Sequence, residues 1–161
     1  MENEFNPAKM LVERALSMID EVPEQSFYLL MLAGAGGQDP RGLYLLGRML
    51  TDGKGVEQDV EKGIGYIEQS AGLGYPDAEY WLACRYYFGT GTDVDYDKAF
   101  GYVTSAVEHG HVEAMNLLCD CYVHGHGVPA DPQKGVEWLL KYSEAKGIDG
   151  MPIDEPEEEQ E

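Results

Sequence analysis

Three groups of residues in this sequence could carry chemistry. The stretch GKGVEQD at 53–59 mixes glycines with acids, so it could be a calcium loop or a phosphate cradle. The stretch CDCYVHGHG at 119–127 brings two cysteines and two histidines close together, as a zinc site would. Three serines, Ser70, Ser105 and Ser143, are candidate nucleophiles, since a hydrolase needs a hydroxyl held beside an oriented base.

The glycine loop lacks the ligands of a calcium site. A calcium loop that began at Asp52 would need oxygen ligands at its third and fifth positions, glycine at the sixth and glutamate at the twelfth. The residues at those positions are Lys54, Val56, Glu57 and Gly63. No strand is predicted before the glycines and no lysine–serine pair follows them, so the loop does not fit a phosphate site either. We predict no cofactor here.

The cysteine and histidine cluster is also a poor metal site. Cys119 and Cys121 are two residues apart, so on a helix their side chains diverge by about 200° and cannot both face one ion. We therefore predict no bound metal and expect the cysteines to pack in the core. The histidines are expected to be exposed in loops and turns: His109, His111, His124 and His126. None of the three serines lies in a nucleophile-elbow context, so we predict that the protein is not an enzyme.

The same residue types return every 36 residues along the chain. The recurring features are a leucine before a small residue (46–47, 82–83, 118–119), a GxG (53–55, 89–91, 125–127), an aspartate (59, 95, 131), a lysine (62, 98, 134) and an aromatic residue (66, 102, 138). This register predicts three repeats, 40–74, 76–110 and 112–147.

Each repeat has the pattern of two helices. In the second repeat Ala78, Leu82 and Tyr86 fall on one face of a helix, which the GxG then ends, since glycine accepts the left-handed conformation of a C-cap. The recurring aspartate is a candidate N-cap for the second helix. Upstream, 25–37 is predicted to be a second helix of the same kind and 7–20 its degenerate partner, so 7–37 is an atypical terminal unit.

The stretch GLYLLGRMLTDGKGVEQDVEKGIGYIEQSAGLG at 42–74 resembles a Sel-1-like repeat, a relative of the tetratricopeptide repeat. The departures from the family pattern are Leu50 in place of a tyrosine, Thr92 in place of a valine, and one extra residue before Gly147. The resemblance implies an all-α fold, a right-handed α/α superhelix (solenoid) of helix pairs. It also implies a non-enzymatic adaptor that binds a protein or peptide and needs no cofactor.

In tetratricopeptide-like arrays the first helices line the concave face, where side chains not needed for packing meet the ligand. Carried over by register, the predicted binding residues are Tyr44, Arg48, Thr51, Tyr80, Cys84, Tyr87, Asn116, Asp120 and His124, and we add Trp81 and Arg85, which adjoin this set. Phe88 adjoins them. Arginines among aromatic residues are typical of binding hot spots. The alternative is that Trp81 and Phe88 pack between repeats and that the arginines pair with neighbouring acids.

Charge narrows the choice of partner. The 161 residues carry a formal charge of -19, and the chain before Asp149 is still acidic, near -12. Such a surface repels nucleic acid and anionic lipid, so neither is a predicted partner. An alternative function follows from the same charge: an acidic inhibitor or immunity-type protein that neutralises a basic bacterial effector.

Compartment and domain limits complete the predictions. The first residues are acidic where a signal peptide needs bases, and no segment approaches the ~20 apolar residues of a membrane span. Three cysteines without framework spacing favour a reduced, cytoplasmic protein. We predict one repeat domain, 1–148, followed by a disordered acidic tail, 149–161.

Overall fold

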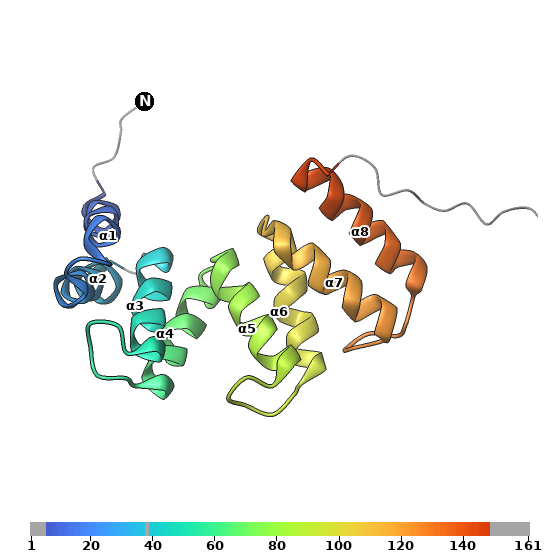
Figure 1. Ribbon diagram of the computed structural model, residues 1–161, viewed down its shortest axis with the longest axis horizontal. Coiled ribbons are helices and arrows are strands. Elements are labelled where there is room, and N and C mark those ends of the chain that lie inside the picture. Colours follow the sequence, from blue (N-terminus) through green and yellow to red (C-terminus); the bar gives the residue numbers. More distant parts are fainter. Residues whose placement is uncertain (1–5, 38, 149–161) are drawn as a thin grey trace, which may run out of the picture.

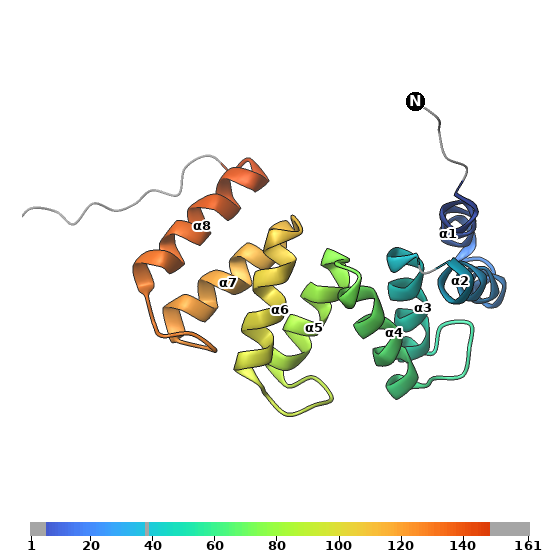
Figure 2. The same ribbon diagram turned by 180° about the vertical axis from the view of Figure 1, so that it is seen from behind.

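The computed structural model describes residues 6–37 and 39–148, and this part of the chain folds into α-helices without any strand. The helices are α1 (Pro7–Met18), α2 (Pro23–Gly37), α3 (Pro40–Asp52), α4 (Val60–Gly72), α5 (Pro76–Phe88), α6 (Tyr96–Glu108), α7 (Val112–His124) and α8 (Pro132–Lys146). They follow one another along a curved row, with the GxG loops at its outer edge (Figures 1 and 2). The predicted α/α solenoid is confirmed, and the predicted acidic tail lies outside the described residues.

The recurring loop ends one helix and starts the next, as predicted. Gly53, Gly89 and Gly125 cap α3, α5 and α7 with φ of 67°, 66° and 71°, a conformation that suits glycine. The aspartates that follow, Asp59, Asp95 and Asp131, each accept a backbone N–H from the first turn of α4, α6 or α8. Prolines open α3, α5 and α8, where a missing N–H costs nothing. The GxG is therefore a turn in all three repeats.

Small residues let the two helices of a repeat cross closely. A Cβ added to Gly47 of α3 would lie 2.6 Å from the carbonyl oxygen of Gly63 on α4. A Cβ added to Gly63 would lie 2.7 Å from the carbonyl oxygen of Gly47. The small residue beside the recurring leucine, Gly47 in the first repeat, is therefore required by packing, as expected from the sequence.

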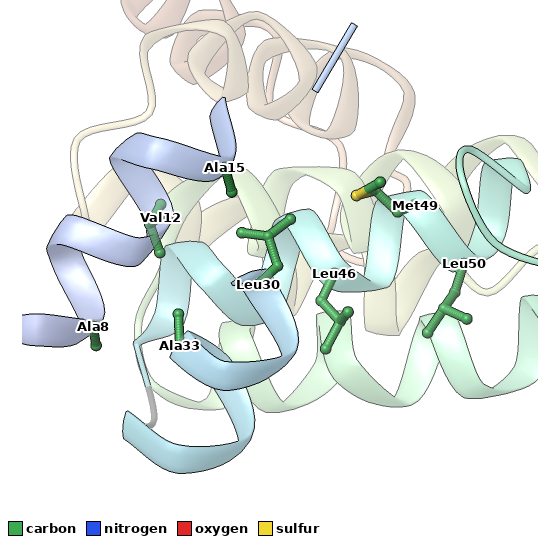
Figure 3. Packing of buried hydrophobic residues seen from close by; sticks show 8 residues of the cluster. All are labelled: Ala8, Val12, Ala15, Leu30, Ala33, Leu46, Met49 and Leu50. Carbon is green, nitrogen blue, oxygen red and sulfur yellow. The ribbon is translucent and has the colours of Figure 1, made fainter. Parts of the chain in front are cut away.

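The N-terminal unit packs on the first repeat through one apolar cluster. The side chains of this cluster come from α1, α2 and α3 (Figure 3). They are Ala8, Val12, Ala15, Leu30, Ala33, Leu46, Met49 and Leu50. The hydroxyl of Ser26 on α2 donates to the carbonyl of Ala15 on α1 over 3.0 Å, which closes this helix pair. The helix α1 ends at Met18, before the predicted limit of 7–20.

Candidate protein-binding face

The predicted binding residues lie on α3, α5 and α7, the three first helices of the repeats. None of their side chains is buried, and Asn116 and His124 are exposed. The two arginines, Arg48 and Arg85, differ in how far their hydrogen-bonding capacity is already used.

Arg48 is held by its own helix. Its Nη1 donates to the hydroxyl of Tyr44 and its Nη2 to a carboxylate oxygen of Asp52, each over 3.2 Å. Burial lowers the pKa of Arg48, but the Tyr44 hydrogen bond and the Asp52 charge outweigh it and leave this pKa raised. The guanidinium is therefore permanently charged and already paired with an acid, as the alternative reading of the sequence expects for the arginines.

Arg85 is held by a neutral partner. Its Nη2 donates to the carbonyl oxygen of Gly91 over 2.7 Å, and its guanidinium carbon lies 5.7 Å from the ring centroid of Trp81. Within the described ranges 6–37 and 39–148, no carboxylate forms an ion pair with Arg85. The charge of Arg85 is therefore available to a ligand, and its other nitrogens remain free to donate.

Trp81 and Phe88 behave differently from each other. Trp81 packs partly against Ile67, Leu82 and their neighbours at the contact between α4 and α5. Phe88, at the end of α5, leaves 65% of its surface exposed. The expectation that both aromatics pack between repeats therefore holds for Trp81 alone.

Contacts between aromatic rings join one repeat to the next. The ring of Tyr44 lies 5.5 Å from that of Tyr75, and the ring of Tyr80 stacks 4.2 Å from that of His111. Tyr75 and His111 are the N-cap residues of α5 and α7, one register apart. Burial raises the pKa of Tyr80 to about 12, so its hydroxyl stays neutral. The sequence signal for this contact is a pair of ring-bearing residues that returns after 36 positions, Tyr44 with Tyr75 and then Tyr80 with His111.

Two histidine predictions are wrong. The His111 side chain is only 12% exposed, because Tyr80 covers its ring. Its Nδ1 also accepts the backbone N–H of Ala114 and so caps α7. His126 is half-buried, because its ring stacks 3.8 Å from that of Tyr96. His109 and His124 are exposed, as predicted.

Thr51 and Tyr87 face the second helix of their own repeat. A Cβ on Gly63 would lie 2.7 Å from the Thr51 methyl group, which places Thr51 against α4. The Tyr87 ring contacts Tyr96 at the start of α6, and its hydroxyl lies 3.0 Å from Nδ1 of His126. Burial raises the pKa of Tyr87 to about 12. Both side chains therefore take part in packing within and between repeats.

The cysteines are part of the packing. Cys119 and Cys121 are buried, as predicted, and Cys84 is half-buried. Burial raises the pKa of all three thiols, that of Cys121 to about 11. Over the described residues, no group of three or more histidines, cysteines and acids is arranged to hold a metal ion.

Comparison with known proteins agrees with this register. The Sel1 repeat family model matches three consecutive segments, 40–75, 76–111 and 112–146. The chain belongs to the Sel1 repeat family. The N-terminal unit, α1 and α2, lies outside the matched segments. No protein among the curated ones matches.

Solved Sel1 structures share the fold. A Sel1 repeat protein from Oxalobacter formigenes has 25% identity and a TM-score of 0.80, over 89% of this chain and 61% of that one. A protective antigen of uropathogenic Escherichia coli displaying an SLR fold has 26% identity and a TM-score of 0.78, over 86% of this chain and 30% of that one. The chain thus spans only part of the length of either protein. In the part that the structure describes, no helix has the length and apolarity needed to cross a membrane.

Proposed function

We propose that this Sel1 repeat protein is a non-enzymatic adaptor that binds a protein or peptide along its first helices. Sel1 repeat proteins generally serve as scaffolds for protein interactions. The observation that carries the proposal is the pair formed by Trp81 and Arg85, in which an aromatic face lies beside a cation that no carboxylate of residues 6–37 and 39–148 pairs with. We infer a reduced, cytoplasmic setting from the free thiols.

The surroundings of this pair support a binding centre. Phe88 lies one helical turn beyond Arg85 and is largely exposed. Trp and Arg are the residue types most enriched in hot spots, because each offers a large contact area together with hydrogen-bond donors. A carboxylate of the partner would find free donors on Arg85, whereas on Arg48 it would have to displace Asp52. We therefore place the centre of the site on α5.

Affinity capture from the native cell tests this proposal. Arg85→Ala and Trp81→Ala should each reduce recovery of bound proteins at least about tenfold relative to the wild-type chain. Arg41→Ala is the matched control, because Arg41 is an exposed arginine that pairs with Glu13 on α1. Equal recovery of every partner by all four proteins would reject the binding face.

A second candidate is the acidic antidote to a cationic protein. It is favoured by four acids on the same helices, Asp52, Asp77, Glu113 and Asp120, none of which is buried. Long-range attraction of this kind weakens with salt. If the captured partner dissociates between about 0.1 M and 0.5 M salt while Trp81→Ala has little effect, the antidote function replaces the adaptor function.

A further inference from the structure

The helix α2 carries apolar side chains that the solenoid does not bury. Tyr28 is 66% exposed, Leu32 64% and Met31 40%. They occupy one side of the helix at spacings of three and four residues, so they form a continuous ridge. The opposite side of α2 supplies Leu30 and Ala33 to the core.

The second helix of the first repeat, α4, shows that the fold does not need this ridge. Leu30 of α2, Ile67 of α4 and Val103 of α6 are fully buried, which fixes the register among these helices. In that register Met31 and Leu32 correspond to Glu68 and Gln69 of α4, which are exposed. The helix α4 has a helix pair on each side and still leaves these positions open. A further repeat before α1 would therefore not cover the ridge on α2.

A depression adjoins the ridge at Met31. It has a volume of about 720 Å³ and lies between α2, the loop after α3 and the start of α4. Its apolar lining is Phe27, Met31, Leu50, Val56 and Val60, and Val60 is itself 41% exposed. The ring of Phe27 lies 6.1 Å from that of Tyr28, so the depression and the ridge are one surface.

The rim of the depression is acidic. Glu57, Asp59 and Glu61 lie along it with one base, Lys62. An apolar floor with an acidic rim is complementary to an amphipathic helix that has lysine or arginine beside its apolar face. Met31 suits such a partner, because methionine adapts its shape to the side chain that packs on it.

We propose that the surface formed by Phe27, Tyr28, Met31, Leu32 and Val60 is a second binding site, which accepts a basic amphipathic helix of a partner protein. The site is independent of the proposed face on α5, because it lies on the N-terminal unit and the adjoining loop. Loss of binding at one site therefore leaves binding at the other intact.

The test uses a labelled leucine–lysine peptide of about 18 residues with helical periodicity, and a peptide of the same composition without an apolar face. Fluorescence anisotropy should show that the full chain binds the first peptide at least about tenfold more tightly than the second. The double variant Met31→Glu/Leu32→Gln, which copies α4, should remove that preference and keep the wild-type melting temperature. Leu140→Glu is the matched control at the equivalent position of α8, which is also exposed.

Three results would overturn the proposal. One is equal affinity for the two peptides, and another is unchanged affinity in Met31→Glu/Leu32→Gln. The third is a concentration-dependent dimer in sedimentation velocity that this double variant abolishes, because the ridge would then belong to a second copy of the chain. Arg85→Ala should leave the peptide affinity unchanged, which separates this site from the face on α5.

Discussion

The loop of the second repeat differs from the loops of the first and third in what its second glycine touches. A Cβ on Gly127 would lie 2.2 Å from the carbonyl oxygen of Tyr96, and one on Gly55 would lie 2.5 Å from the carbonyl carbon of Pro23. Both glycines thus lie against the start of the preceding second helix. Around Gly91 the nearest atoms are instead the guanidinium nitrogens of Arg85, at 3.3 Å.

Two substitutions account for this difference. Val56 and Val128 pack against the core from the first and third loops, whereas the second loop has Thr92 at this position. Arg85 takes the position that buried Met49 and Cys121 hold in the other repeats. The GxG motif is therefore a turn in all three repeats, but its second glycine packs against the preceding second helix only in the first and third. The second repeat lacks this packing contact, and its Arg85 lies beside Gly91 instead.

Replacing the second glycine of a GxG loop should cause the largest loss of stability, and the loss should differ between the second and third loops. Gly127→Ala is expected to lower the free energy of unfolding by roughly 3 kcal/mol or more, because the backbone must move to admit the methyl group. Gly91→Ala should cost only about 1–2 kcal/mol, since it adds backbone strain beside a flexible side chain. Urea denaturation followed by circular dichroism measures both values. Equal losses would show that the second loop is packed like the third.

Removing an N-cap should cost the same in every repeat. Asp95→Ala and Asp131→Ala should each lower the free energy of unfolding by about 1 kcal/mol, because each leaves a backbone N–H of the first helical turn without its acceptor. Denaturation curves of the two variants provide the measurement. A cap that mattered only in the third repeat would contradict the view that the turn itself is common to all loops.

Restoring the packing of the second loop should increase stability and abolish binding. The double variant Arg85→Met/Thr92→Val gives the second repeat the residue types of the first. We expect a gain of about 0.5–1 kcal/mol from the buried apolar area, together with loss of the partner captured by the wild-type chain. A melting scan and the capture assay should therefore change in opposite directions. If the variant is more stable and still binds its partner, the missing packing contact of the second loop is not needed for binding.

A small pH effect should also be specific to the second repeat. Glu79 is buried where the other repeats have Leu43 and Met115, and its carboxylate accepts hydrogen bonds from Ser105 and from Nδ1 of His109. The hydrogen bond to Glu79 and the charge of that carboxylate raise the pKa of His109. Stability from this pair is therefore complete below the ordinary histidine pKa of about 6.5 and is lost as pH rises through the raised value.

Melting temperatures of the wild type and of His109→Gln provide the measurement for this pair. Between about pH 6 and pH 8.5 the wild type should lose slightly more stability than the variant. Parallel pH profiles for the two proteins would mean that the ion pair contributes nothing measurable.

The sequence was sufficient for the features that depend on register. Helix order, the capping glycines and aspartates, and the small residues at the helix crossings all follow from the spacing of 36 residues. It was insufficient where the neighbour of a side chain decides its role. Thr51 and Tyr87 lie one helical turn beyond Arg48 and Cys84, but they face α4 and α6. His111 is covered by the ring of Tyr80. The exposed ridge on α2 has the same cause, since an apolar residue in a helix does not by itself reveal which side is covered.

Site-specific photo-cross-linking in the native cell tests the binding face most directly. A photoreactive phenylalanine placed at Asn116 would lie on the exposed side of α7, and one placed at Glu137 on the exposed side of α8. We expect a cross-linked partner from position 116, lost when Arg85→Ala is added, and none from position 137. Cross-links from position 137 alone, or adducts at 116 that persist with Arg85→Ala, would contradict a binding face centred on α5.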